Sequence, residues 1–253
     1  YDSAGIAITN GALRLFKSKG RVQDLEASIN GCDVSGNIGI GHTRWATHGE
    51  PSQINAHPHY SQNKTLAMIH NGIIENYASL RAELISRGHE FLSETDSEVL
   101  IHLIEDIQQN ENVAFVEAVR IALSQVVGAY AIAILNREDP DTLIAARKGS
   151  PLVVGIGDGE HFIASDATPL IEYTKQVVYL NDEEIAIIPR TGDFRIITIS
   201  DQKRTPYVQK LEMNLTAIEK GGFDHFMMKE IYEQPRSIKD SMRGRLRIDL
   251  EKI

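Results

Sequence analysis

The chain alternates between two hydrophobic periods, and the change from one to the other predicts where strands and helices lie. Apolar residues alternate with polar ones at Gly5 to Thr9 and again at Leu13 to Lys17, with Asn10-Gly11 between them, which predicts a β-hairpin. Turn residues separate later runs, most clearly Asp139-Pro140-Asp141 and Thr191-Gly192-Asp193. Further strands are predicted at 38–43, 65–70, 129–135, 143–146, 152–156, 162–165, 177–180, 184–188 and 195–199.

Helical spacing replaces this pattern in the middle of the chain. One helix is predicted at 75–87 and should stop at Gly88. A second opens with Thr95-Asp96-Ser97-Glu98, a capping-box pattern in which Glu98 would accept from the Thr95 amide. A third helix covers 113–125, and a short one 169–173. Strands in series without long helices between them favour antiparallel sheets with helices packed outside, an α+β fold.

Composition narrows the class of protein. The chain has 253 residues and a formal net charge of −9, which disfavours nucleic acid as a partner. Its longest apolar run, Val126 to Leu135, is half the roughly twenty residues that a membrane-spanning helix needs, so we expect no membrane partner. The single cysteine, Cys32, allows no internal disulfide, and a cytoplasmic location is the simple expectation. No motif indicates a cofactor.

Polar residues gather between Gly41 and His59. Five of the nine histidines, namely His42, His48, His57, His59 and His70, fall within about thirty residues. A metal site is one interpretation, but no cysteine joins these histidines and their spacings match no compact ligand motif. His57 and His59 flank a proline, so we expect their rings to point to opposite sides.

An amino-acid clamp is a second interpretation of this region. Arg44 could hold a carboxylate through two charged hydrogen bonds, and Asp96 could receive an ammonium group. Each residue also has an ordinary structural explanation, because Asp suits any helix start and a lone Arg is often on the surface.

Asn71-Gly72 likewise has two interpretations. The pair could be a simple turn, which the sequence alone favours, or an oxyanion hole made by the Asn side-chain amide and the Gly backbone N–H. Trp45, the only tryptophan, is usually a packing residue. Cys32 has no base nearby in sequence, so it is expected to be a bystander.

Several longer motifs carry a family resemblance across nearly the whole chain. They are Tyr1-Asp2-Ser3-Ala4-Gly5, Gly41-His42-Thr43-Arg44-Trp45-Ala46-Thr47-His48-Gly49, Asn55-Ala56-His57-Pro58-His59, His70-Asn71-Gly72-Ile73-Ile74-Glu75-Asn76 and Thr95-Asp96-Ser97-Glu98, with Arg147 to Leu152, Ser165 to Leu170 and Lys229 to Pro235 later. In these motifs the chain resembles the N-terminal glutaminase domain of the glucosamine-6-phosphate synthases, which are class II glutamine amidotransferases.

The resemblance implies an N-terminal-nucleophile hydrolase fold, a four-layer αββα sandwich with two antiparallel sheets. It implies hydrolysis of glutamine to glutamate and ammonia, and passage of the ammonia to sugar isomerase domains of the same polypeptide that aminate fructose-6-phosphate. It also implies a homodimer when the protein is full length. By match of motif, Arg44 would bind the glutamine carboxylate and Asp96 its amino group. Thr47 and His48 would line the pocket, Asn71 and Gly72 would form the oxyanion hole, Trp45 would gate the ammonia path, and His57 would support the site.

The chain departs from the family pattern at both ends. The family's nucleophile is a cysteine at the first position of the mature chain, where Tyr1 stands here, so this chain alone is expected to be inactive. Residues 1–220 are predicted to be the glutaminase domain without its first strand, helix and cysteine. Residues 221–253 are predicted to be the end of that domain and the start of a linker to the isomerase domains. The alternatives are a glutaminase domain of the phosphoribosylpyrophosphate type, a non-catalytic module of the same fold, and a metal-dependent hydrolase.

Overall fold

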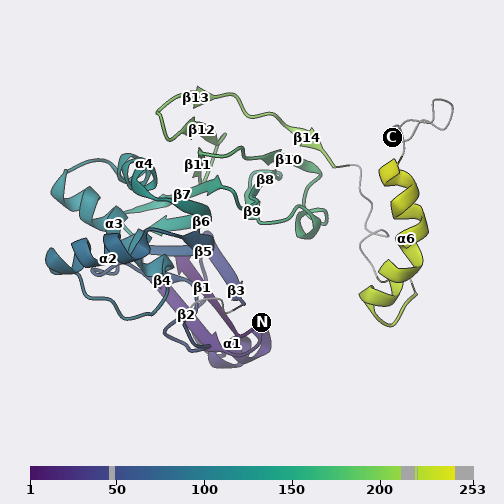
Figure 1. The fold of residues 1–253 in the computed structure, drawn as a ribbon, viewed down its shortest axis with the longest axis horizontal. Helices are drawn as coiled ribbons and strands as arrows, with labels where there is room; N and C mark the ends of the chain where they lie inside the picture. The colour runs from purple at the N-terminus through teal and green to yellow at the C-terminus, as the bar shows by residue number, and fades with distance from the viewer. Residues whose placement is uncertain (46–48, 212–219, 221, 243–253) are drawn as a thin grey trace. The chain divides into compact units, whose positions relative to one another are not determined.

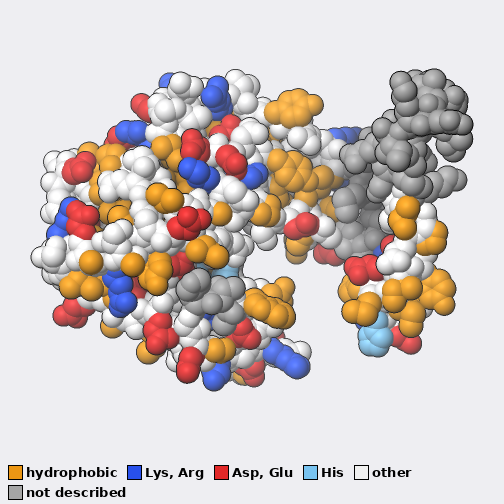
Figure 2. Space-filling model, viewed as in Figure 1, with side chains coloured by type: hydrophobic (Ala, Val, Ile, Leu, Met, Phe, Trp, Pro, Cys, Tyr) orange, Lys and Arg blue, Asp and Glu red, His pale blue; other side chains and the backbone are white. Residues whose placement is uncertain are grey.

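The computed structural model describes residues 1–45, 49–211, 220 and 222–242 of the chain. These residues belong to two compact units, 1–210 and 211–253. The second unit contains helix α6 (Phe226–Met242), on which Figure 2 shows exposed apolar side chains. Met227 and Tyr232 are exposed on this helix. In the described part of the chain, no helix is both long enough and apolar enough to span a membrane.

A seven-stranded antiparallel sheet forms the centre of the first unit (Figure 1). Its strand order is β13 (Lys203–Arg204), β12 (Arg195–Thr198), β11 (Glu184–Pro189), β7 (Asp139–Lys148), β6 (Gly128–Asn136), β5 (Leu66–Ile74) and β4 (His59–Tyr60). Alternate side chains of β5 and β6, including Met68 and Ile132, pack against the helices, because successive residues of a strand face opposite sides.

Three helices cover that face of the sheet: α2 (Tyr77–Ser86), α3 (Ser97–Asn110) and α4 (Phe115–Gln125). Their apolar residues, such as Leu84, Ile104 and Val119, are almost completely buried in one cluster with the sheet. Helix α2 ends as the sequence predicts, since Gly88 takes a φ of 94° and the next amide, that of His89, returns to the Leu84 carbonyl at 3.0 Å.

Two smaller antiparallel sheets cover the opposite face. One has the order β2 (Leu13–Lys19), β1 (Ser3–Thr9), β3 (Ile38–Arg44), and it buries Ala7 and Ile40 against the central sheet. The other has the order β14 (Gln209–Lys210), β10 (Gln176–Tyr179), β8 (Val153–Ile156), β9 (His161–Ala164), and it buries Val154 and Val178. Helix α1 (Val22–Ser28) packs beside β1 and β2, and the 3-10 turn Thr168–Leu170 lies by β9.

The expected α+β sandwich of antiparallel sheets is therefore confirmed, with its second sheet layer in two parts. In the described residues, β3 and β9 each form the outermost strand of their sheet. A cavity of about 450 Å³ is lined by residues of both strands, among them Thr43 and Ile163, and by Ala131 of the central sheet.

Three local predictions from the sequence are wrong. Asp139-Pro140-Asp141 is not the turn but the beginning of β7, because Asp139 already pairs with Asn136 and the hairpin closes two residues earlier. Asn71-Gly72 is not a turn either, since β5 continues through both residues to Ile74. The capping box at Thr95 is absent, because the Glu98 carboxylate accepts from the Leu92 and Ser93 amides instead.

Candidate active site

A cavity of about 250 Å³ opens where β3, β5 and the start of α3 meet. Most of the residues that the motifs single out line it. From β3 and the residue after it come His42, Thr43, Arg44 and Trp45; from β5 come His70, Asn71 and Gly72; from the start of α3 come Thr95, Asp96 and Ser97; and His57 completes the wall. Thr47 and His48, predicted to line the same pocket, lie outside the described residues. We call this cavity the β3–β5–α3 pocket.

Arg44 is the last residue of β3 and its side chain is held by the loop that follows. It is only 5% exposed, and its guanidinium donates to the Gly49 carbonyl at 3.2 Å and the Glu50 carbonyl at 3.5 Å. Burial lowers the pKa of Arg44, and the charges of Asp2 and Asp96 oppose that lowering. Because the pKa of arginine starts above 12, the guanidinium remains a buried cation on the pocket wall.

Asp96 precedes α3 without capping it. Its side chain makes no bond to the helix N-terminus, and Oδ2 instead accepts from the Ile74 amide of β5 at 2.7 Å. The carboxylate is 7% exposed and its charge acts on Arg44. The structural explanation from sequence, an ordinary helix cap, is therefore wrong. Asp96 is bonded across to the strand that carries Asn71 and Gly72.

Asn55 connects the loop that holds Arg44 to the loop that leads into Asp96. Its Nδ2 donates to the Glu50 carbonyl at 3.0 Å and to the Glu94 carboxylate at 3.1 Å, and its Oδ1 accepts from the Glu94 amide at 3.0 Å. Asn55 is 3% exposed, and its bonds to the more exposed Glu50 and Glu94 are partly buried. The two charged residues of the pocket are thereby set relative to each other.

Gly72 has no room for a side chain. Its φ is +136°, and a Cβ there would lie 2.1 Å from the carbonyl oxygen of Ala129 on the neighbouring strand β6. Gly72 is therefore required by the close approach of two backbones in the pocket wall. Asn71, the residue before it, is exposed to the cavity, and its Oδ1 lies 2.8 Å from Nε2 of His42.

The histidines form a packed cluster. The rings of His42 and His57 lie 4.4 Å apart, and those of His57 and His59 lie 4.7 Å apart. The expectation that His57 and His59 point to opposite sides is wrong, because both rings pack into this cluster across the cis His57–Pro58 bond. Burial is the main cause that lowers the pKa of His42, His57 and His70, and it lowers the pKa of His59 to about 3. All four rings are therefore neutral at pH 7.

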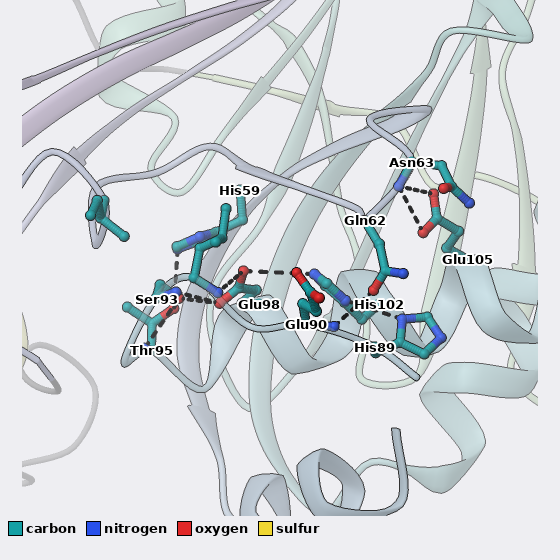
Figure 3. Close-up of polar contacts among 12 residues, drawn as sticks. His59, Gln62, Asn63, His89, Glu90, Ser93, Thr95, Glu98, His102 and Glu105 are labelled. Carbon is teal, nitrogen blue, oxygen red and sulfur yellow. Dashed lines mark hydrogen bonds and ion pairs between the residues drawn. The ribbon is translucent and has the colours of Figure 1, made fainter. Parts of the chain in front are cut away.

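A buried hydrogen-bond chain runs from this cluster into α3 (Figure 3). His59 Nε2 lies 3.1 Å from the Thr95 hydroxyl, which lies 2.9 Å from the Ser93 hydroxyl, and Ser93 donates to Glu98 at 2.7 Å. Burial alone would raise the pKa of Glu98, but hydrogen bonds from His102, Leu92 and Ser93 lower it to about 2. Thr95 belongs to this chain and to the pocket wall.

Lys17 lines another cavity of about 450 Å³ together with His59, Ser93 and Glu98 of this hydrogen-bond chain. Its Nζ donates to the carbonyls of Ile54 and Ala56 at 2.9 and 2.7 Å, which anchors the segment just before His57. Burial lowers the pKa of Lys17 to about 8.

Trp45 and Cys32, the two other candidates from the sequence, differ in whether they line the pocket. Trp45 lines the pocket and is 75% exposed, so it is not a core residue. Cys32 is exposed and does not line the pocket in the described residues. Within those residues, no group of three or more His, Cys, Asp or Glu side chains is arranged to hold a metal ion.

Sequence reasoning missed several residues of the wall. Five residues that line the pocket were given no role in binding or hydrolysis, namely His42, Thr43, His70, Thr95 and Ser97. Their place inside the family motifs is the signal that could have indicated them. The sequence does not show which of these side chains face the cavity, because that depends on the geometry of the strands and the helix.

Known proteins with similar sequences agree on one family. A family model described as a glutamine amidotransferase domain matches residues 19–219. The chain is 54% identical over 255 residues to the protein of Bacteroides thetaiotaomicron named glutamine–fructose-6-phosphate aminotransferase (isomerizing), covering 100% of this chain and 42% of that protein. The protein of the same name from Chlorobaculum tepidum is 51% identical over 98% of this chain and 41% of its own length. The chain thus spans about two fifths of these relatives.

Solved structures with a similar fold extend the comparison. Glutamine phosphoribosylpyrophosphate amidotransferase from B. subtilis, complexed with ADP and GMP, has a TM-score of 0.63 and 26% identity, over 84% of this chain and 44% of that one. A glutamine aminotransferase class-II domain protein from Silicibacter pomeroyi has a TM-score of 0.51 and 17% identity, over 79% of this chain and 92% of that one, and indicates the fold alone.

Proposed function

Because the chain belongs to the glutamine amidotransferase domain family, we propose that its β3–β5–α3 pocket binds L-glutamine and contributes to hydrolysis of the side-chain amide. The observation that carries the proposal is the pairing of a buried cation, Arg44, with a buried anion, Asp96, on one small cavity. An α-amino acid is a zwitterion, so it presents a carboxylate to the first residue and an ammonium to the second.

In this proposal the remaining wall supplies hydrogen-bond donors for the charge that develops during amide hydrolysis. Attack on the glutamine amide places negative charge on its oxygen, and preorganised N–H donors stabilise that charge. Asn71 and Gly72 are the donors in this proposal. Their neighbour Ile74 is bonded to Asp96 at 2.7 Å, so the strand that carries the donors is fixed to the residue that would hold the ammonium end.

The nucleophile in this proposal is the cysteine that the family resemblance implies, and Cys32 does not take that role. A thiol must reach the amide carbon, whereas Cys32 is exposed and does not line the pocket among the described residues.

We further propose that the ammonia is used to aminate fructose-6-phosphate, by analogy with the name of the relatives that are 54% and 51% identical. A phosphoribosylpyrophosphate acceptor is less well supported, because the solved structure of that type is only 26% identical. In this proposal the acceptor site belongs to a sugar isomerase portion of the protein, Trp45 gates the passage of ammonia, and the protein works as a homodimer. Residues 1–220 act as the glutaminase domain and 221–253 lead to that portion.

The clamp can be tested with ligands that each lack one charged end. Calorimetry would measure binding of L-glutamine, of 4-carbamoylbutanoate, which lacks the α-ammonium, and of 4-aminobutanamide, which lacks the α-carboxylate. A hydrogen bond to a charged group contributes about 1.5–3 kcal/mol, so Asp96→Asn and Arg44→Ala should each weaken glutamine binding about tenfold to a hundredfold.

The matched ligands give the decisive comparison. Asp96→Asn should leave the affinity for 4-carbamoylbutanoate unchanged, and Arg44→Ala should leave that for 4-aminobutanamide unchanged, because each ligand lacks the group that the lost side chain would contact. If each variant weakened all three ligands equally, the clamp would be refuted. Release of glutamate by the protein as its gene encodes it tests the hydrolysis, and no release at any glutamine concentration would refute the proposed activity.

A further inference from the structure

The pocket wall contains a histidine that neither the clamp nor the oxyanion hole uses. His42 lies on β3 and its Nε2 is 2.8 Å from Oδ1 of Asn71 on β5. An amide oxygen has no hydrogen to give, so the hydrogen in this bond must come from the imidazole.

The Asn71 amide is turned with its Oδ1 toward Nε2 of His42. With Oδ1 directed at His42, the Nδ2 hydrogens are on the other side of the amide group. An oxyanion hole needs those hydrogens, because an amide oxygen facing the developing charge would repel it. If the Asn71 side-chain amide were rotated by half a turn, the acceptor Oδ1 would take the place of the donor Nδ2 on the side away from His42.

The bond also fixes the protonation of His42. A neutral imidazole has one N–H, and here that hydrogen is on Nε2, so Nδ1 is unprotonated. Nδ1 is buried and has no hydrogen-bond partner in the described residues, which leaves no competing contact to turn the ring.

The ring of His42 is held in place by contacts that return to β5. The His70 amide donates to Nδ1 of His57 at 3.3 Å, and the His57 ring lies 4.4 Å from that of His42. His70 and Asn71 are consecutive on β5, so the contacts form a closed circuit from β5 through His57 and His42 and back to β5. A circuit of this kind resists rotation of any one member.

We infer that His42 is a positioning residue for Asn71, which it holds through an Nε2–H to Oδ1 hydrogen bond so that the Asn71 NH2 group faces the reacting amide oxygen. The inference rests on the proposed function, because it assigns a role within the same oxyanion hole. His42 acts through Asn71 and not on the substrate carboxylate or ammonium.

The test uses glutamate release by the protein as its gene encodes it. His42→Ala should lower kcat by about tenfold or more with little change in KM, since loss of one oxyanion donor costs about 10²–10³ in kcat. In an Asn71→Ala background, His42→Ala should cost nothing further, because there is no amide left to orient. Equal losses in both backgrounds would overturn the inference.

Two conservative variants separate positioning from packing. The amide nitrogen of glutamine reaches about as far as Nε2 of histidine, and that of asparagine about as far as Nδ1. His42→Gln should therefore restore most of the kcat lost in His42→Ala, whereas His42→Asn should not. If both variants had the same kcat, His42 would be a packing residue.

A readout without catalysis distinguishes failure of this inference from failure of the proposed function. The ¹⁵N spectrum of the His42 ring at pH 7 should show Nε2 protonated and Nδ1 unprotonated. A ring protonated at Nδ1 would refute the positioning bond whatever the activity. Absence of glutamate release by the wild-type protein, together with the expected spectrum, would refute the function and leave the bond intact.

Discussion

Acid should destabilise the first unit through its buried histidines, and His59 allows the size of the effect to be worked out. Its ring is 3% exposed and its pKa is lowered to about 3 by burial, with the charge of Lys17 adding to the lowering. In the unfolded chain a histidine titrates near 6.5. Between those two values the unfolded state carries a proton that the folded state does not, so the free energy of unfolding falls as pH falls.

The hydrogen-bond chain explains why the folded state does not take that proton. Ser93 donates its hydroxyl hydrogen to Glu98, so it must accept from Thr95, and Thr95 must then accept from Nε2–H of His59 (Figure 3). The neutral ring already supplies the one hydrogen that this chain requires. A second proton on Nδ1 would add a charge in a buried site.

The magnitude follows from the two pKa values. One histidine with this shift should cost about 2 kcal/mol of unfolding free energy between pH 7.5 and pH 5.0, at about 1.4 kcal/mol per pH unit once the unfolded ring titrates. Glu98 does not contribute in this interval, because its pKa is lowered to about 2, and its stabilisation is lost only as pH falls below its ordinary value of 4.5.

Urea unfolding followed by circular dichroism at pH 7.5, 6.5, 5.5 and 5.0 would measure the effect. His59→Gln keeps an N–H donor for Thr95 and removes the titrating ring. From pH 7.5 to pH 5.0, the free energy of unfolding of this variant should therefore fall by about 2 kcal/mol less than that of wild type. His225→Gln, at an exposed position in the second unit, is the matched control and should follow wild type. Parallel pH profiles for wild type and His59→Gln would refute the reasoning.

Two further predictions concern the pocket wall. Gly72→Ala should destabilise the first unit by about 2 kcal/mol or more beyond Gly11→Ala, because both glycines have positive φ but a Cβ at position 11 meets nothing within 4 Å. Equal melting temperatures for the two variants would show that β5 can move away from β6. Trp45→Ala should leave the free energy of unfolding within about 0.5 kcal/mol of wild type. It should also leave glutamate release intact, while lowering transfer of the ammonia to the sugar. The control is Tyr207→Ala, because Tyr207 is about as exposed as Trp45 and lies outside the pocket. If Trp45→Ala transferred as much ammonia as wild type, Trp45 would not gate the ammonia path.

The hydrophobic pattern predicted the elements well because most of them are buried on one face. Strands β1, β2 and β3 and the helices α2, α3 and α4 lie where alternation and helical spacing place them, within a few residues. The exceptions are set by contacts between distant segments. Pro140 looks like a turn residue, yet it falls in a register shift of β7, between the pairs Asn136–Asp139 and Leu135–Leu143, where the missing N–H costs no ladder bond.

In the site too, the local sequence predicted which residues take part, but not the contacts that they make with distant segments. Motifs identified Arg44 and Asp96 as candidate ligands, and both line one cavity. Their bonds to the Gly49 carbonyl and the Ile74 amide could not be foreseen, because each depends on how a loop or strand distant in sequence approaches. Glu98 is the clearest failure, since local spacing favoured the Thr95 amide and the folded chain offers the Leu92 and Ser93 amides instead.

The close approach of β5 and β6 at Gly72 has a genetic consequence. Every amino acid other than glycine carries a Cβ, and that atom alone would lie 2.1 Å from the Ala129 oxygen. Every missense codon at position 72 therefore introduces this clash, however small or polar the side chain. In a saturation library sorted for folded protein, position 72 should lose substitutions more completely than position 11, where the positive φ disfavours side chains but a Cβ meets nothing within 4 Å.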